Sequence, residues 1–185
     1  LAKAGSLIVQ LKERADVSPY IVSELTALFR EVKEAMEKIK ELETNIDSIA
    51  KTLKQYDLFR SAPGVGPITA ATMLVLLCNP AVFKNGREFA AYIGLAPKSS
   101  GSGGKNFVTH IPKKCECNND VRALLVQCAH SICRCKHKSD WVSSILARKP
   151  KKVAIIAIAN KLARQLWIMA KKGEKFENRF ILAAV

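Results

Sequence analysis

Apolar residues in the first third of the chain follow a heptad spacing. They recur at alternating intervals of four and three, at Ile21, Leu25, Leu28, Val32, Ala35, Ile39, Leu42, Ile46, Ile49, Leu53 and Tyr56. This spacing is typical of a coiled coil with apolar a and d positions. Ser18 and Pro19 suit an N-cap and a first helical residue. We therefore expect one long helix through Tyr56. Its stripe needs a partner helix in trans or from upstream, unless the helix lies on its own globular domain.

Proline and glycine divide the rest of the chain into shorter segments. The turn at 61–67 precedes a nearly all-apolar stretch, and later apolar periodicities predict helices over 68–78, 87–93, 119–136, 139–148 and 153–172. Asn118 or Asn119 is expected to cap the third of these helices. Residues 106–111 alternate as in a short strand. The predicted fold is all-α: a coiled-coil region over 1–60 and a compact helical domain over 61–185, with one short strand or β-hairpin near 105–111.

Charge divides the chain at the same point. Residues 1–60 carry 10 Lys+Arg and 10 Asp+Glu, and residues 61–185 carry 20 and 6, which accounts for the whole net charge of +14. A polyanionic partner is therefore expected to meet the second part, although a basic surface that serves solubility is the alternative. The chain begins at Leu1, so we expect a segment upstream, with residues 1–17 forming the end of a helix.

The sequence disfavours a membrane, a disulfide framework and a zinc site. No run reaches the ~18 apolar residues of a membrane span. Five of six cysteines crowd into residues 115–135, which fits reduced thiols in a cytosol. Cys115 and Cys117, like Cys133 and Cys135, are spaced by one residue, whereas zinc sites usually leave two to four. We expect no metal site, and Cys128 on an apolar stripe is expected in the core.

The stretch from Gly94 to Lys105 combines glycines, serines and lysines. Ser99, Ser100 and Ser102 alternate with glycines, and no Asp or Glu lies between Glu88 and Glu116. Such a composition predicts an open loop that offers hydroxyl and N–H groups to a phosphate. A flexible linker is the alternative, since a serine without a base or metal is a poor nucleophile.

The turn Gly64-Val65-Gly66 lies between two predicted helices. It looks like a helix–hairpin–helix element, in which glycines admit a DNA backbone and the next helix points N–H groups at a phosphate. A plain packing corner between helices is an equal alternative.

The order of five segments resembles one family. Residues 61–71 read SAPGVGPITAA, 83–97 read FKNGREFAAYIGLAP, 102–105 read SGGK, 122–129 read RALLVQCA and 151–162 read KKVAIIAIANKL. Together they resemble the bridge-RNA-guided insertion-sequence transposases of bacteria, which join a RuvC-like DEDD domain to a C-terminal serine domain through a coiled coil. The likeness covers about residues 20–175.

This resemblance implies a function and a set of site residues. Ser102 corresponds to the family's DNA-attacking serine, with Ser100 as the fallback and Ser99 a weaker choice. The expected DNA-binding residues are Gly64, Val65, Gly66, Lys98, Lys105, Lys113, Lys114 and Arg122. The expected partners are DNA, a guide RNA and further copies of the chain through the coiled coil, in a bacterial cytoplasm. Mg²⁺ belongs to an acidic domain that this chain lacks, so the chain alone is expected to be inactive.

The sequence departs from the family at one place and leaves other functions open. Cys117 stands where the family has a glycine, after an apparent insertion over 112–118. One alternative is a non-catalytic module that binds nucleic acid and dimerises. Another is a coiled-coil scaffold, which explains residues 18–57 but not the basic second part.

Overall fold

The computed structural model describes residues 2–14, 16–53, 55–97, 99–102, 105–108, 118–136 and 138–176. Across these residues the chain is helical apart from one short two-stranded ribbon, so the predicted all-α class is confirmed. Its internal contacts separate two units, Leu1–Ile46 and Asp47–Val185. This division lies upstream of the predicted boundary at residue 60, because the segment just before residue 60 belongs to the core of the second unit.

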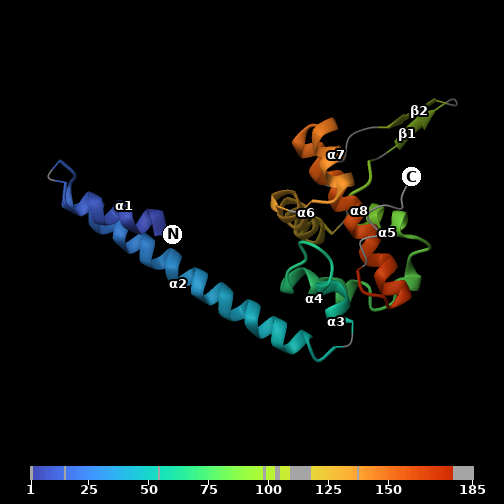
Figure 1. Ribbon diagram of the computed structural model, residues 1–185, viewed down its shortest axis with the longest axis horizontal. Coiled ribbons are helices and arrows are strands. Elements are labelled where there is room, and N and C mark those ends of the chain that lie inside the picture. The colour runs from blue at the N-terminus through green and yellow to red at the C-terminus, as the bar shows by residue number, and fades with distance from the viewer. Residues whose placement is uncertain are drawn as a thin grey trace. The chain divides into compact units, whose positions relative to one another are not determined.

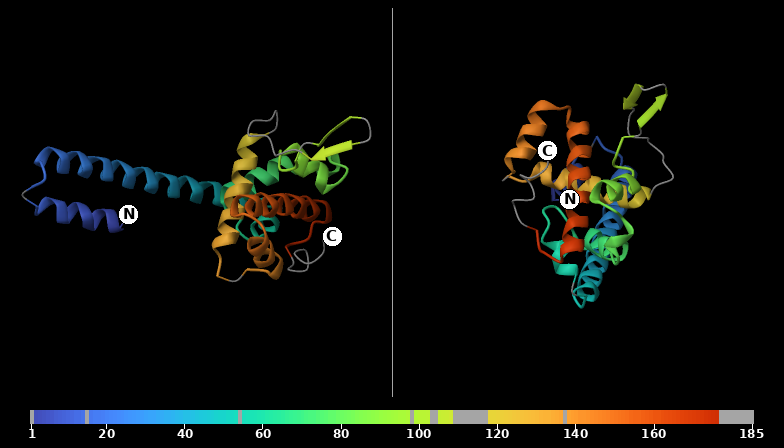
Figure 2. Two further views of the ribbon diagram at one scale, coloured as in Figure 1. Left: turned by 90° about the horizontal axis from the view of Figure 1, so that it is seen from above. Right: turned by 90° about the vertical axis from the view of Figure 1, so that its right-hand side faces the viewer.

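The first unit is a helical hairpin. α1 (Ala2–Lys12) runs back along the first part of α2 (Pro19–Ala50), as the left view of Figure 2 shows. The helices approach at Gly5, where an added Cβ would lie 3.3 Å from Cζ of Phe29. α2 begins at Pro19, as predicted.

The apolar stripe of α2 is not covered by α1. Phe29 and Val22 face α1, whereas the neighbouring heptad positions Leu28, Val32 and Ile39 are each at least half exposed. The predicted need for a partner helix therefore still applies to the stripe. Ion pairs between neighbouring turns, such as Lys38 with Glu41 at 2.9 Å, lie on exposed faces and contribute little to stability.

The prediction that the long helix continues through Tyr56 is wrong. α2 ends at Ala50, and a turn leads into α3 (Tyr56–Arg60). Tyr56 and Phe59 are fully buried in the second unit rather than lying on the heptad stripe. Burying these aromatic rings in the core stabilises the protein more than leaving them on a solvent-exposed stripe would, so the helix ends before them.

The second unit is built around α8 (Lys151–Lys172), shown in red near the middle of this unit in Figure 1. The helices that pack on it are α3, α5 (Gly86–Tyr92), α6 (Asn119–Arg134) and α7 (Asp140–Arg148), together with the 3₁₀ turn η1 (Pro80–Val82). α4 (Pro67–Leu76) packs on α3 and α6. Two hydrogen bonds anchor connecting segments to α8: Trp167 Nε1 donates to Pro80 O at 3.0 Å, and Asn160 Nδ2 donates to Leu95 O at 3.1 Å.

α8 is a core helix. Within the described part of the chain it is long and apolar enough to span a membrane, yet 61% of its most apolar window is buried inside the fold. Eleven side chains, from Ala154 to Ala170, form this buried face. The helix ends at Gly173, whose φ of +70° suits the left-handed C-terminal position that glycine favours.

A two-stranded antiparallel ribbon extends from the helices of the second unit. β1 (Ser99–Ser102) pairs with β2 (Lys105–Val108), and both Figure 1 and Figure 2 show the ribbon leading away from the helices. The expected strand near 106–111 is thus present over 105–108, and residues 109–111 lie outside the described residues.

Candidate nucleic-acid interface

A tight turn joins α3 and α4 where the sequence predicted either a helix–hairpin–helix element or a plain packing corner, and we call this turn the hairpin. Ser61 caps the C-terminal end of α3, and α4 begins at Pro67 with Gly66 as its N-cap in an extended conformation. Pro67 suits this position because the first helical N–H has no partner in any helix. The turn joins two buried helices, Leu58 and Phe59 on one side and Ala70 and Met73 on the other. The sequence thus correctly predicted the local geometry of this turn.

The two glycines of the hairpin have different surroundings. Gly64 adopts φ +74°, and a Cβ there would lie 2.7 Å from Cys128 O and 2.9 Å from Ile132 Cγ1 on α6. Gly66 has nothing within 4 Å of an added Cβ. Gly64 is therefore required for packing against α6, and Gly66 is the glycine that leaves open space for another molecule.

The Cys128 thiol is buried beside the start of α4. Burial raises the pKa of this thiol, and hydrogen bonds with Thr69 and with the Gly66 backbone oppose that rise. The sulfur lies 3.5 Å from Thr69 Oγ1, and Cys128 is 4% exposed. Cys128 is thus the predicted small core residue.

A network of hydrogen bonds and ion pairs around Asp47 contacts the hairpin. Asp47 Oδ1 accepts a 2.6 Å hydrogen bond from the Tyr56 hydroxyl, and Asp47 Oδ2 lies 2.6 Å from Lys51 Nζ. Burial, together with the Asp47 carboxylate, raises the pKa of Tyr56 to about 12, so the hydroxyl stays protonated as a donor. Arg60 Nη1 donates to Val65 O at 2.5 Å. Arg60 therefore links the turn to Asp47, whose Oδ1 is 3.9 Å from its Nε.

The serine segment is a strand, and the prediction of an open loop is wrong for residues 99–102. Ser100 pairs with Phe107 and Ser102 pairs with Lys105 in the antiparallel register. Partner residues such as Phe107 and Val108 favour strands, and the two residues left between Ser102 and Lys105 are both glycine, a sequence typical of tight hairpin connections. The loop prediction was wrong because it rested on the composition of the serine segment and left out its pairing with the strand that follows.

The register groups two of the predicted site residues. Ser102 and Lys105 occupy the same rung at the end of the ribbon, and Ser100 lies two positions earlier in β1. Lys98, Lys113 and Lys114 lie outside the described residues. Four residues before β1 the chain is anchored to α8, because Leu95 is 1% exposed and its carbonyl accepts a hydrogen bond from Asn160.

Arg122 lies in the first turn of α6. Asn118 caps this helix by accepting a 3.2 Å hydrogen bond from Val121 N, which confirms one of the two predicted caps. The Arg122 guanidinium is half-buried and donates to Asn119 Oδ1 at 2.9 Å. It is therefore engaged within the helix start.

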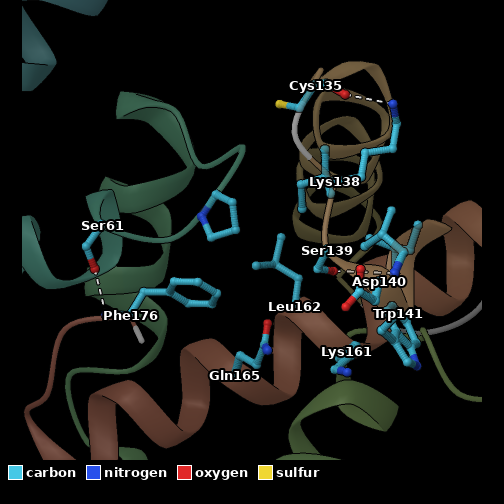
Figure 3. A pocket seen from close by; sticks show the side chains of 14 residues that line it. Ser61, Cys135, Lys138, Ser139, Asp140, Trp141, Lys161, Leu162, Gln165 and Phe176 are labelled. Carbon is cyan, nitrogen blue, oxygen red and sulfur yellow. Dashed lines mark hydrogen bonds between the residues drawn. The ribbon is translucent and has the colours of Figure 1, made fainter. Parts of the chain in front are cut away.

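A cavity of about 470 Å³ lies beside the hairpin, between α7 and α8 (Figure 3). Its apolar wall includes Ile132 and Leu162, and Phe176 covers one side through a 2.8 Å hydrogen bond from its N to Ser61 Oγ. Lys161 Nζ lies 3.9 Å from the centroid of the Trp141 ring. Burial, with help from the charge of Arg164, lowers the pKa of Lys161. Of the predicted site residues, Gly64, Val65, Gly66 and Arg122 do not line this cavity.

Sequence reasoning missed several features of the hairpin region. The spacing of Asp47 and Arg60 in the sequence does not indicate that Arg60 bonds to the Val65 carbonyl and lies near Asp47. This arrangement depends on where α2 ends. No group of three His, Cys, Asp or Glu side chains that could hold a metal lies together within the described residues. Cys115 and Cys117, two of the cysteines considered for a zinc site, lie outside the described residues.

Comparisons with known proteins identify relatives of the whole chain. Residues 56–142 match the sequence model of the family described as "Transposase IS116/IS110/IS902 family". The chain is 35% identical to a putative transposase of Sinorhizobium fredii, over 95% of this chain and 47% of the relative. It is 31% identical to the transposase for insertion sequence element IS1328 of Yersinia enterocolitica, over 91% of this chain and 52% of the relative.

A third relative, the transposase for insertion sequence element IS1111A of Coxiella burnetii, is 28% identical over 91% of this chain and 47% of its own length. The chain thus spans about half the length of the curated relatives it matches. The family match includes the hairpin, the serine ribbon and α6, the three elements that carry the described site residues. Over residues 56–142 the chain is thus similar to the IS116/IS110/IS902 family of transposases, and over most of its length it is similar to proteins named as transposases.

Proposed function

We propose that the chain is the C-terminal part of a transposase that binds DNA and supplies Ser102 as the nucleophile for strand cleavage and transfer. The observation that carries this proposal is the register of the ribbon, which puts Ser102 and Lys105 on one rung within the family-matched region. A cation at this position favours a nearby phosphate and stabilises the charge that develops on it.

The reaction is a transesterification. The Ser102 Oγ attacks the phosphorus, an Oγ–P bond forms, and the bond from phosphorus to the leaving strand breaks. The proton of Oγ passes to a base, and the leaving oxygen takes up a proton as a free hydroxyl. Transfer to another strand is the reverse step, with a strand hydroxyl attacking the phosphoserine and regenerating Ser102.

The base is expected outside this chain. No Asp or Glu lies between Glu88 and Glu116, so the ribbon segment has no acidic residue of its own. In this proposal a RuvC-like acidic domain of the complete protein would hold Mg²⁺ and would supply the base that accepts the proton. The chain alone would then bind DNA without cleaving it, and a guide RNA is a further expected partner of the complete protein.

The test is a covalent adduct between the complete transposase and labelled DNA carrying the element ends, detected as a shifted band on a denaturing gel. Ser102→Ala is expected to abolish the adduct while DNA binding stays within about twofold of the parent. Ser100→Ala, two positions earlier in the same strand, is the matched control and should keep the adduct. If the adduct persists in Ser102→Ala and disappears in Ser100→Ala, the nucleophile is Ser100 instead.

A non-catalytic role is the second candidate, and the exposed stripe of α2 favours its dimerisation part. Val32, Ile39 and Leu42 on α2 are about half exposed. A second copy would cover them. This candidate predicts salt-sensitive binding of nucleic acid with no adduct for any serine variant or for the parent, even in the complete protein.

A further inference from the structure

Two loops of the second unit bring together a set of cations that the proposed reaction does not use. One follows α6 and carries Lys136 and Lys138. The other joins α7 to α8 and, with the helix ends beside it, carries Arg148 at the end of α7, Lys149 in the loop, and Lys151 and Lys152 in the first turn of α8. All six residues are exposed, and we call them the basic corner. None of the six forms an ion pair with a carboxylate of the described residues.

The two segments lie at the two ends of one short helix. Lys138 stands two residues before α7 and Arg148 ends it, and at 1.5 Å per residue its nine residues span roughly 13 Å. Lys138 is held in place by a 2.7 Å hydrogen bond from its Nζ to Cys135 O, visible in Figure 3. Asp140, two residues after Lys138, is the only acidic residue between Asp120 and Glu174.

The placement of these cations opposes helix stability. Lys151 and Lys152 occupy the first turn of α8, which has no acidic residue and no side-chain cap. Positive charge at the positive end of a helix dipole is unfavourable. An anion bound there would reverse the sign of this effect.

The surroundings favour a duplex backbone over a single strand. Proteins that hold single strands combine cations with exposed aromatic rings on which bases stack. Trp141 is the only Phe, Tyr or Trp between residues 118 and 166, it is half-buried, and Lys161 already lies against its ring. The basic corner therefore offers charge without a stacking surface, which matches phosphate contacts along a double helix.

We propose that the basic corner of Lys136, Lys138, Arg148, Lys149, Lys151 and Lys152 is a second docking surface for the phosphate backbone of duplex DNA, separate from the serine ribbon. This inference rests on the proposed function for the identity of its partner. It assigns DNA contact to residues that do not touch the reacting atoms.

The experiment measures binding of the 185-residue chain to a labelled duplex by fluorescence anisotropy across a salt series. The variant removes three charges, Lys149→Gln, Lys151→Gln and Lys152→Gln. The matched control removes three exposed lysines near the other end of α8, Lys84→Gln, Lys171→Gln and Lys175→Gln. Both carry the same net charge, and circular dichroism melting curves check that both remain folded.

The expected result is an affinity loss of about tenfold or more for the corner variant at moderate salt. Its slope of log K against log salt should also become shallower by about 2.7, because each phosphate contact contributes about 0.9. The control should lose less than threefold. Equal losses in both variants would mean that only net charge matters, and this result would overturn the proposal.

Two further outcomes separate this proposal from the catalytic one. If the corner variant loses binding to single-stranded RNA but keeps duplex binding, the assigned partner is wrong. If the corner variant binds duplex like the parent while the complete Ser102→Ala protein still loses its adduct, the basic corner is not a docking surface and the nucleophile proposal stands. If the parent chain binds no duplex at all, both proposals fail.

Discussion

At the scale of single residues, Gly64 and Gly66 lie two positions apart in one turn but face different neighbours. We expect Gly64→Ala to lower the free energy of unfolding by about 2–4 kcal/mol. Its positive φ disfavours a side chain, and the new Cβ would meet the Cys128 carbonyl. Urea denaturation followed by tryptophan fluorescence measures the change.

Gly66→Ala is the matched control for stability and a probe of binding. A methyl group there enters open space at φ −87°, so the free energy of unfolding should change by less than about 1 kcal/mol. Duplex binding should weaken if the hairpin lets a DNA backbone come close. A Gly66→Ala chain that is as unstable as Gly64→Ala would show that the turn is only a packing corner.

At the scale of elements, the apolar stripe of α2 predicts self-association. Val32→Glu puts a charge on the stripe, and burying it against a second copy would be unfavourable. We expect at least a tenfold weaker dimer, measured by sedimentation equilibrium. Thr44→Glu adds the same charge on an exposed position off the stripe and should leave the dimer unchanged. If Val32→Glu and Thr44→Glu give the same distribution of molecular masses at every protein concentration, the chain does not dimerise through this stripe.

The elements also show how far sequence periodicity reaches. The helices predicted from the 3.6-residue pattern are present within a few residues of their expected ends, and Asn118 caps α6 as predicted. Periodicity failed at Tyr56, because a heptad position does not reveal that a tertiary core competes for the ring. It also failed at the serine segment, because strand pairing depends on a partner from a later part of the chain. The sequence could not show that Gly64 packs against α6 whereas Gly66 faces open space, because this difference depends on where α6 lies.

At the scale of the whole molecule, the two units differ in how much of their backbone is protected by packing. Every residue from 30 to 42 in α2 is exposed, whereas half of the 22 residues of α8 are buried. Hydrogen exchange followed by mass spectrometry should therefore be at least tenfold faster for amides of 30–42 than for α8 at low protein concentration. The difference should shrink as concentration rises and copies associate. Slow exchange in 30–42 for a monomer would contradict this expectation.

α8 also sets a fixed length within the second unit. Lys151 lies in its first turn, and Asn160, which holds the Leu95 carbonyl four residues before the serine ribbon, lies nine residues later. At 1.5 Å per residue these points are roughly 13 Å apart along the helix axis, about the rise of four nucleotides in a strand of B-form DNA. If the regions around Lys151 and Asn160 both contact one duplex, α8 fixes the distance between the two contacts. The cleaved bond would then lie at a constant number of base pairs from the phosphates that Lys151 contacts.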